Sequence, residues 1–231
     1  MLGQRFIHRI ITLKESIKPL NQRSASLFLT LLICGDLVFV VLHFMNVLIH
    51  SLKNNLLSLE VDKGYPEMYQ YLKFLWIIIV IIFIALKDAS LHYVSWVLIF
   101  AYFLLDDSLQ VHENVGYYIS ENLSFAPILG LRLQDFGELA VSCAAGIILL
   151  LPLIFAYVKG SNRFRKISQD LTFLIFVLLF FGVVVDMAHI AIQLGDRVHF
   201  AIGAIEDGGE MLSVSLILWY IFLIQNIFNR N

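Results

Sequence analysis

The sequence predicts an all-α protein, a polytopic membrane bundle of six transmembrane helices with both termini in the cytoplasm. Of the 231 residues, 59% are hydrophobic and 15% are charged, and the mean hydropathy is +0.82. Soluble domains average nearer half apolar and a quarter charged residues, and a chain of this length could not bury the excess in one core. This composition argues against a soluble enzyme or a disordered chain. The net charge of −2, without a basic patch, argues against a nucleic-acid partner.

Six apolar segments approach the roughly 20 residues that a helix needs to cross a bilayer. They lie at about 26–50, 71–87, 90–111, 136–158, 169–194 and 207–228. The second segment, YLKFLWIIIVIIFIALK, is almost uniformly apolar, and we expect it to face lipid.

Residues 1–25 form a separate basic segment ahead of a transmembrane domain at 26–231. The segment combines five basic residues with several isoleucines, its basic members being Arg5, Arg9, Lys14, Lys18 and Arg23. It is either an amphipathic helix on an anionic membrane surface or a basic flank that sets the topology.

Positive charge orients the chain, because cytoplasmic loops carry an excess of Lys and Arg. A cytoplasmic N-terminus places 11 of the 16 basic residues inside: Arg5, Arg9, Lys14, Lys18, Arg23, Lys87, Lys159, Arg163, Arg165, Lys166 and Arg230. The first, third and fifth spans then run outward, and the fourth and sixth run inward.

Polar residues form stripes on five of the six spans. In the first span, Asp36, His43, Asn46 and His50 follow one another at steps of 7, 3 and 4, which places them on one helix face. The other stripes comprise Asp106, Gln110 and Glu113 beside Asp107 and His112; Asp135, Glu138 and Ser142; Asp186, His189 and Gln193; and Glu206, Glu210 and Ser213 beside Asp207. Nearly all lie in the outer half of the membrane, so we expect one shared polar cavity open to the extracytoplasmic face.

Some of these residues have simpler structural interpretations. Asp135, Glu206 and Asp207 lie near expected helix N-termini and would serve equally well as caps. Asp36 would serve to hydrogen-bond a neighbouring helix. The remaining carboxylates are harder to explain in this way, because several of them cannot all ionise in a low dielectric without a compensating cation. Arg132 and Arg197 are the obvious basic residues on that side.

Carboxylates with imidazoles are ligands for zinc, iron or manganese. Asp186 and His189 stand at i and i+3, which puts both groups on one helix face, as in carboxylate-bridged metal bundles. The sequence therefore predicts a divalent metal site with candidate ligands Asp106, Glu113, Asp186, His189, Glu206 and Glu210. His112 is a candidate ligand or catalytic acid/base. A metal-dependent enzyme acting on a lipid-like, membrane-partitioned substrate is the first hypothesis.

Two other classes of function stay open. A proton or cation channel or transporter would use intramembrane ionisable residues, here Asp36, His43, Asp107, Glu138 and Asp207. Such a protein would work alone, as a homo-oligomer or with partner membrane subunits. Alternatively, the chain is a structural subunit whose carboxylates only cap and cross-link helices. The segment 114–135 would be a lid or a re-entrant loop.

Two short motifs resemble a pair found in uncharacterised bacterial polytopic membrane proteins. The first is LLDDSLQVHENVG (104–116) and the second is IEDGGEMLSVSLIL (205–218). The matching positions are Asp106, Asp107, His112, Glu113, Glu206, Asp207 and Glu210. The resemblance implies a protein of the bacterial inner (plasma) membrane and brings no assigned activity.

Overall fold

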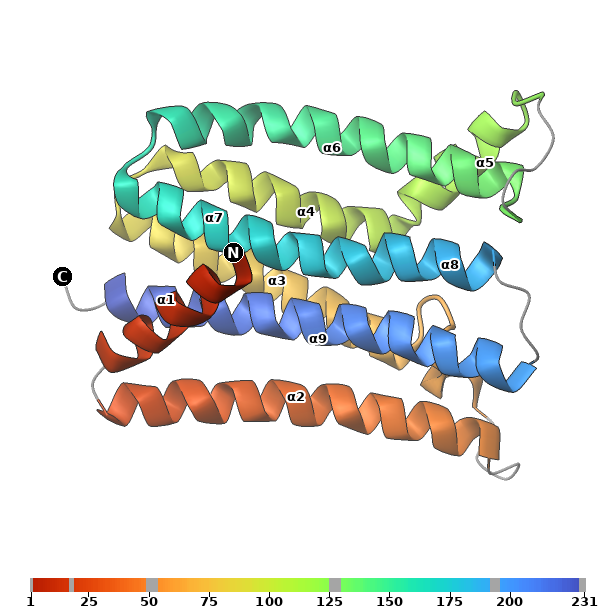
Figure 1. Ribbon diagram of the computed structural model, residues 1–231, viewed down its shortest axis with the longest axis horizontal. Helices are drawn as coiled ribbons and strands as arrows, with labels where there is room; N and C mark the ends of the chain where they lie inside the picture. The colour runs from red at the N-terminus through yellow and green to blue at the C-terminus, as the bar shows by residue number, and fades with distance from the viewer. Residues whose placement is uncertain (1, 17–18, 49–53, 125–129, 192–195, 229–231) are drawn as a thin grey trace.

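The computed structural model describes residues 2–16, 19–48, 54–124, 130–191 and 196–228, and every regular element within these ranges is helical. The long helices run side by side along one bundle (Figure 1). In chain order the elements are α1 (Leu2–Ser16), α2 (Pro19–Leu48), η2 (Asn55–Leu57), α3 (Tyr65–Lys87), η3 (Leu91–Tyr93), α4 (Val94–Leu109), α5 (Val111–Ser120), α6 (Leu133–Lys159), α7 (Asn162–Leu179), the π-helix η4 (Phe180–Val185), α8 (Asp186–Ala191) and α9 (Asp196–Phe228). The all-α prediction is confirmed.

Five stretches of helix in the described part of the chain are long and apolar enough to cross a membrane. They are Gln22–Asn46, Tyr65–Lys87, Leu133–Lys159, Asn162–Ala191 and Phe200–Phe228. Helices α4 and α5 meet the same criteria only as a pair, and they are bent by 68° at the break between Leu109 and Val111. The protein is therefore a multi-pass membrane protein by the length and composition of its helices. The segment predicted as a span at about 90–111 is helix as far as Leu109, and the chain then bends into α5.

The two ends of the bundle differ in charge. At one end α2 begins, α3 and α6 end, α4 and α7 begin, and α9 ends (Figure 1). We call this the basic end, and its basic residues include Lys87, Lys159, Arg163, Arg165 and Lys166. The opposite, acidic end holds η2, α5, α8 and the start of α9.

Helices α3 and α9 form the centre of the bundle. In α3, Phe74, Ile77 and Ile81 are buried against the core, whereas Trp76 and Phe83 on the other side are exposed. The expectation that segment 71–87 faces lipid is wrong for its inner face. Because almost every position in this segment is apolar, its pattern does not show which face is buried.

Helix α1 packs across α7 and α9 near the basic end (Figure 1). The Phe6 ring lies 5.1 Å from that of Phe173 and 5.9 Å from that of Tyr220, and Arg9 Nη1 donates to Asp170 Oδ1 at 2.7 Å. Ile7 on the opposite face is exposed. Residues 2–16 are thus an amphipathic helix, and the helix expected to begin at 26 begins at Pro19.

Two glycines bring α5 onto the start of α6. A Cβ on Gly116 would lie 2.6 Å from the backbone nitrogen of Glu138, and a Cβ on Gly137 would overlap the carbonyl oxygen of Gly116. The backbones approach this closely only because neither residue has a side chain. Residues 114–120 of segment 114–135 are therefore helix packed on α6, and residues 125–129 lie outside the described ranges.

Candidate functional site

A cavity of about 850 Å³ lies within the bundle, in the size range of roughly 300–1,000 Å³ that is usual for ligand sites. Toward the acidic end it is lined by eleven carboxylates: Glu60, Asp62, Glu67, Asp106, Asp107, Glu113, Glu138, Asp186, Glu206, Asp207 and Glu210. Toward the basic end its lining is apolar and includes Phe74, Trp96, Ile99, Phe103, Leu149, Leu150, Leu153, Ile175, Phe176, Leu178 and Leu179. One continuous space therefore changes from acidic to apolar along the membrane-spanning direction.

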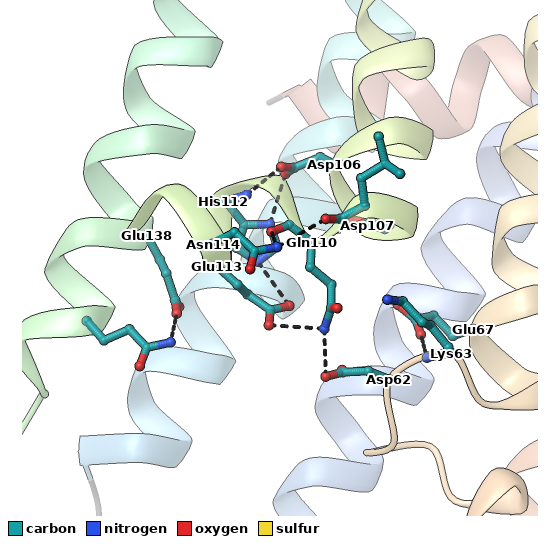
Figure 2. A network of polar contacts seen from close by, with 12 residues as sticks. Asp62, Lys63, Glu67, Asp106, Asp107, Gln110, His112, Glu113, Asn114 and Glu138 are labelled. Carbon is teal, nitrogen blue, oxygen red and sulfur yellow. Dashed lines mark hydrogen bonds and ion pairs between the residues drawn. The ribbon is translucent and has the colours of Figure 1, made fainter. Parts of the chain in front are cut away.

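The break between α4 and α5 places His112 beside Asp106. Gln110 has the left-handed backbone conformation, with φ of 52° and ψ of 46°, which costs a residue with a side chain about 1–2 kcal/mol. The turn lets the His112 backbone N–H donate to Asp106 Oδ1 at 2.9 Å, and His112 Nδ1 donates to Asp106 Oδ2 at 3.1 Å (Figure 2). A carboxylate that accepts from Nδ1 fixes the tautomer and leaves Nε2 as the reactive nitrogen.

The Gln110 side chain ties the same break to the neighbouring loop. Its Nε2 donates to Asp62 Oδ2 at 2.9 Å and to Glu113 Oε2 at 3.2 Å (Figure 2). Across the cavity, Gln134 Nε2 donates to Glu138 Oε1 at 2.7 Å. Neutral amides thus satisfy part of the carboxylate oxygens without adding positive charge.

A second cluster joins α8 to α9. His189 Nδ1 lies 2.8 Å from Glu206 Oε2, and Asp186, three residues before His189, lines the same cavity. An imidazole and two carboxylates from two helices therefore face one part of the cavity.

The π-helix η4 shapes the wall beside this group. A Cβ on Gly182 would lie 2.5 Å from Glu210 Oε1, and a Cβ on Gly209 would overlap the Phe181 ring. Glu210 also accepts a hydrogen bond from Gln70 Nε2 at 3.3 Å. The small residues let η4 and α9 approach closely. Of the neighbouring Gly208 and Gly209, it is Gly209 that permits this helix packing. π-Helical segments are frequent at functional sites.

Fixed positive charge is scarce around the cavity. Among the described residues, Arg132 is the one Lys or Arg in its lining. Its Nη2 lies 2.6 Å from Asp135 Oδ1, and its backbone N–H donates to Asp135 Oδ2 at 2.7 Å. The hydrogen bond to Asp135 raises the pKa of the Arg132 guanidinium above its ordinary value. The cap interpretation of Asp135 is therefore confirmed.

Glu206 and Asp207 do not cap a helix. Helix α9 begins at Asp196, so both carboxylates lie inside it and line the cavity. The expected start near residue 207 is wrong, because the preceding residues continue the helix beyond the apolar segment.

Asp36 belongs to a different centre, where it bonds neighbouring helices, as its structural interpretation predicted; the sequence did not identify its partner Lys73. Lys73 Nζ donates to Asp36 Oδ1 at 2.9 Å and to Met211 O at 2.8 Å, and Ser215 Oγ donates to Asp36 Oδ2 at 2.6 Å. Asp36 and Lys73 are 1% and 0% exposed, so this is a desolvated ion pair joining α2, α3 and α9. An isolated acid in an apolar span requires a partner, and that requirement was the available signal for Lys73.

His43 is also separate from the cavity. Its Nδ1 accepts the Leu59 backbone N–H at 3.0 Å, and its ring stacks on Phe200 at 4.3 Å. The polar stripes of the later helices therefore line the shared cavity, whereas the polar stripe of α2 does not. His50 and Gln193 lie outside the described residues, as does the side chain of Arg197.

All six candidate metal ligands line this one cavity, as do His112, Asp107, Glu138 and Asp207. In the described ranges, however, no three His, Cys, Asp or Glu side chains are grouped closely enough to hold a metal ion. The ligands are instead divided between Asp106 and Glu113 on either side of His112, the His189–Glu206 pair, and Asp186 and Glu210 elsewhere in the lining.

One protein family, described as "Domain of unknown function (DUF8692)", matches residues 62–226 of the chain. The matched region begins just before α3 and contains the helices that line the cavity. No curated protein and no solved structure matches the chain.

Proposed function

The chain belongs to the DUF8692 family, and we propose that it is a membrane enzyme that binds an amphiphile in its cavity together with a divalent cation. The observation that carries this proposal is the polarity of that single cavity, acidic at one end and apolar at the other. A lipid-like molecule has the same two-part character. Its apolar part gains from contact with the apolar lining, and its head lies among the carboxylates.

The proposed topology has six spans, with α4 and α5 together forming a broken span, and both termini in the cytoplasm. The cluster of Lys159, Arg163, Arg165 and Lys166 at the basic end supports this orientation. The acidic part of the cavity then faces the extracytoplasmic side. The motif resemblance supports the bacterial inner membrane as its location.

The proposed cation is zinc, iron or manganese, bound first by Asp186, His189 and Glu206. His189 and Glu206 already contact each other, and Asp186 lines the same cavity one helical turn before His189. Asp106, Glu113 and Glu210 line the same cavity as further ligands. Eleven carboxylates facing one guanidinium need additional positive charge in a low dielectric, and a divalent cation supplies it.

His112 is the proposed catalytic acid/base. Asp106 accepts from its Nδ1 and fixes the ring, so Nε2 is available to a water molecule or a hydroxyl group of the substrate. An acid/base held in this way, in the same cavity as the proposed cation site, suits metal-assisted hydrolysis.

Metal analysis tests the cation. We expect one or two equivalents of zinc, iron or manganese in protein that is purified in detergent without any chelator. The double variant Asp186→Asn/Glu206→Gln should lose it, while Asp170→Asn, a carboxylate at the basic end, should keep it. A folded wild-type protein that binds none of the three metals, even after loading, would overturn the cation part of the proposal.

Filling the cavity tests the amphiphile. Gly146 lines the cavity, and a Cβ there would meet no atom within 4 Å, so the side chain of Gly146→Phe starts in open space and extends into the cavity. Mass spectrometry of the purified protein should show a bound amphiphile in the wild type and its loss in Gly146→Phe. Ile147→Phe, on the exposed face of the same helix, should retain it. Equal occupancy in all three proteins would contradict binding in this cavity.

A further inference from the structure

We infer that the cavity opens sideways into the bilayer between α6 and α7, and that a phospholipid inserts one acyl chain through this opening. The inference rests on the proposed function, and it specifies both the ligand class and its route. Leu150, Phe176 and Leu179 line the cavity, yet they are 50%, 66% and 39% exposed. The same side chains thus border the interior space and the outer surface. We call the opening that they frame the α6–α7 portal.

The portal lies within the hydrocarbon depth of the bundle. Leu150 is well inside α6, and its neighbours Ile147 and Leu151 are exposed apolar residues, as expected for a surface that faces lipid chains. Toward the basic end the two helices are joined, because Gln169 Nε2 donates to Tyr157 Oη at 2.6 Å. The portal therefore faces acyl chains rather than water.

The space behind the portal favours a hydrocarbon occupant. Its walls include Gly146, Leu149, Leu153 and Ile175. Water would find few hydrogen-bond partners there, and an empty apolar space would forfeit dispersion contacts. An acyl chain from the adjoining bilayer fills it while the phospholipid headgroup remains at the acidic end.

Trp96 is a built-in reporter of such a chain. It lines the apolar part of the cavity and is 1% exposed, with its indole N–H bonded to Ser168 Oγ at 2.9 Å. The other two tryptophans serve as an exposed and a buried reference for Trp96. Trp76 is 39% exposed on the outer face of α3, and Trp219 is 5% exposed and outside the cavity lining.

Fluorescence quenching by brominated acyl chains tests the portal. The protein is reconstituted in phosphatidylethanolamine–phosphatidylglycerol vesicles, with or without bromine on the chains. A variant that keeps only Trp96 (Trp76→Phe/Trp219→Phe) should be quenched nearly as strongly as one that keeps only Trp76. A variant that keeps only Trp219 should be quenched several-fold less. Adding Gly146→Phe to the Trp96-only protein should reduce its quenching to the Trp219 level, and adding Ile147→Phe should not.

The outcomes separate this inference from the proposed function. Quenching of Trp96 that matches Trp219 and ignores Gly146→Phe would overturn access through the portal. If Gly146→Phe still removed a co-purified amphiphile in that case, the cavity would remain a ligand site reached from the acidic end. If quenching followed the expected pattern and no metal bound, the result would support entry through the portal and contradict the proposed cation site.

Discussion

At the scale of single residues, the buried ion pair illustrates how charge is accommodated among membrane helices. Asp36 and Lys73 neutralise each other, and Ser215 and the Met211 carbonyl occupy further hydrogen-bonding positions. Removing one member of such a pair leaves an uncompensated buried charge, whereas replacing both members with apolar residues leaves no buried charge.

Asp36→Asn should therefore destabilise the protein by about 3–5 kcal/mol. The double variant Asp36→Leu/Lys73→Met should recover most of that loss. Unfolding by denaturing detergent, monitored by circular dichroism, measures both. A single variant as stable as the wild type would mean that Lys73 does not depend on Asp36 for its charge balance.

Gln110 allows a second test at this scale, because its left-handed backbone reverses the usual order of Gly and Ala in helical surroundings. Gln110→Ala and Gln110→Gly both lose the bonds to Asp62 and Glu113. The glycine variant alone escapes the backbone cost, so it should be the more stable by about 1 kcal/mol. Thermal unfolding of the two proteins side by side decides the order. Greater stability of the alanine variant would show that residue 110 continues a regular helix.

At the scale of elements, the sequence predicted where the helices lie along the chain, but it did not predict which helices pack against each other. Long apolar segments predict spans because the bilayer demands them, and i, i+3, i+4 spacing correctly placed Glu206 and Glu210 on one face. Periodicity fixes the face of a helix but not what lies against it. Periodicity therefore left Asp36 open between the cavity and a bond to a neighbouring helix, and its contact with Lys73 decides for the second. The break at Gln110 carries no local signal, because glutamine rarely adopts the left-handed conformation.

The crossing of α5 and α6 depends on a glycine whose role is steric. Gly137→Ala should destabilise the protein by about 1–3 kcal/mol or more, because the new methyl group meets the backbone of Gly116. Gly146→Ala in the same helix meets nothing within 4 Å, so it should be neutral or slightly stabilising. Comparison of their unfolding midpoints checks the crossing. Similar stability of the two variants would contradict the close approach of the backbones.

At the scale of the whole molecule, the distribution of polar groups bears on ion conduction. The cavity carboxylates stop where Trp96, Leu153 and Phe74 form the lining, and Trp96 is bonded across to Ser168. Proteoliposomes should therefore dissipate a pH gradient no faster than empty liposomes. Protein-dependent leakage that is abolished by Glu138→Gln would show a proton path through the cavity and favour the transport alternative.

The central position of α9 has a consequence for how the bundle is made. Ribosomes synthesise α2 and α3 early and α9 after every other described helix, yet α9 supplies Ser215 to the Asp36–Lys73 pair and packs at the core of the molecule. The earlier helices must therefore enter the membrane while α3 has not yet met its central partner. Asp36 and Lys73 lie on α2 and α3, so their pair is available during that interval, and Ser215 completes it when α9 arrives.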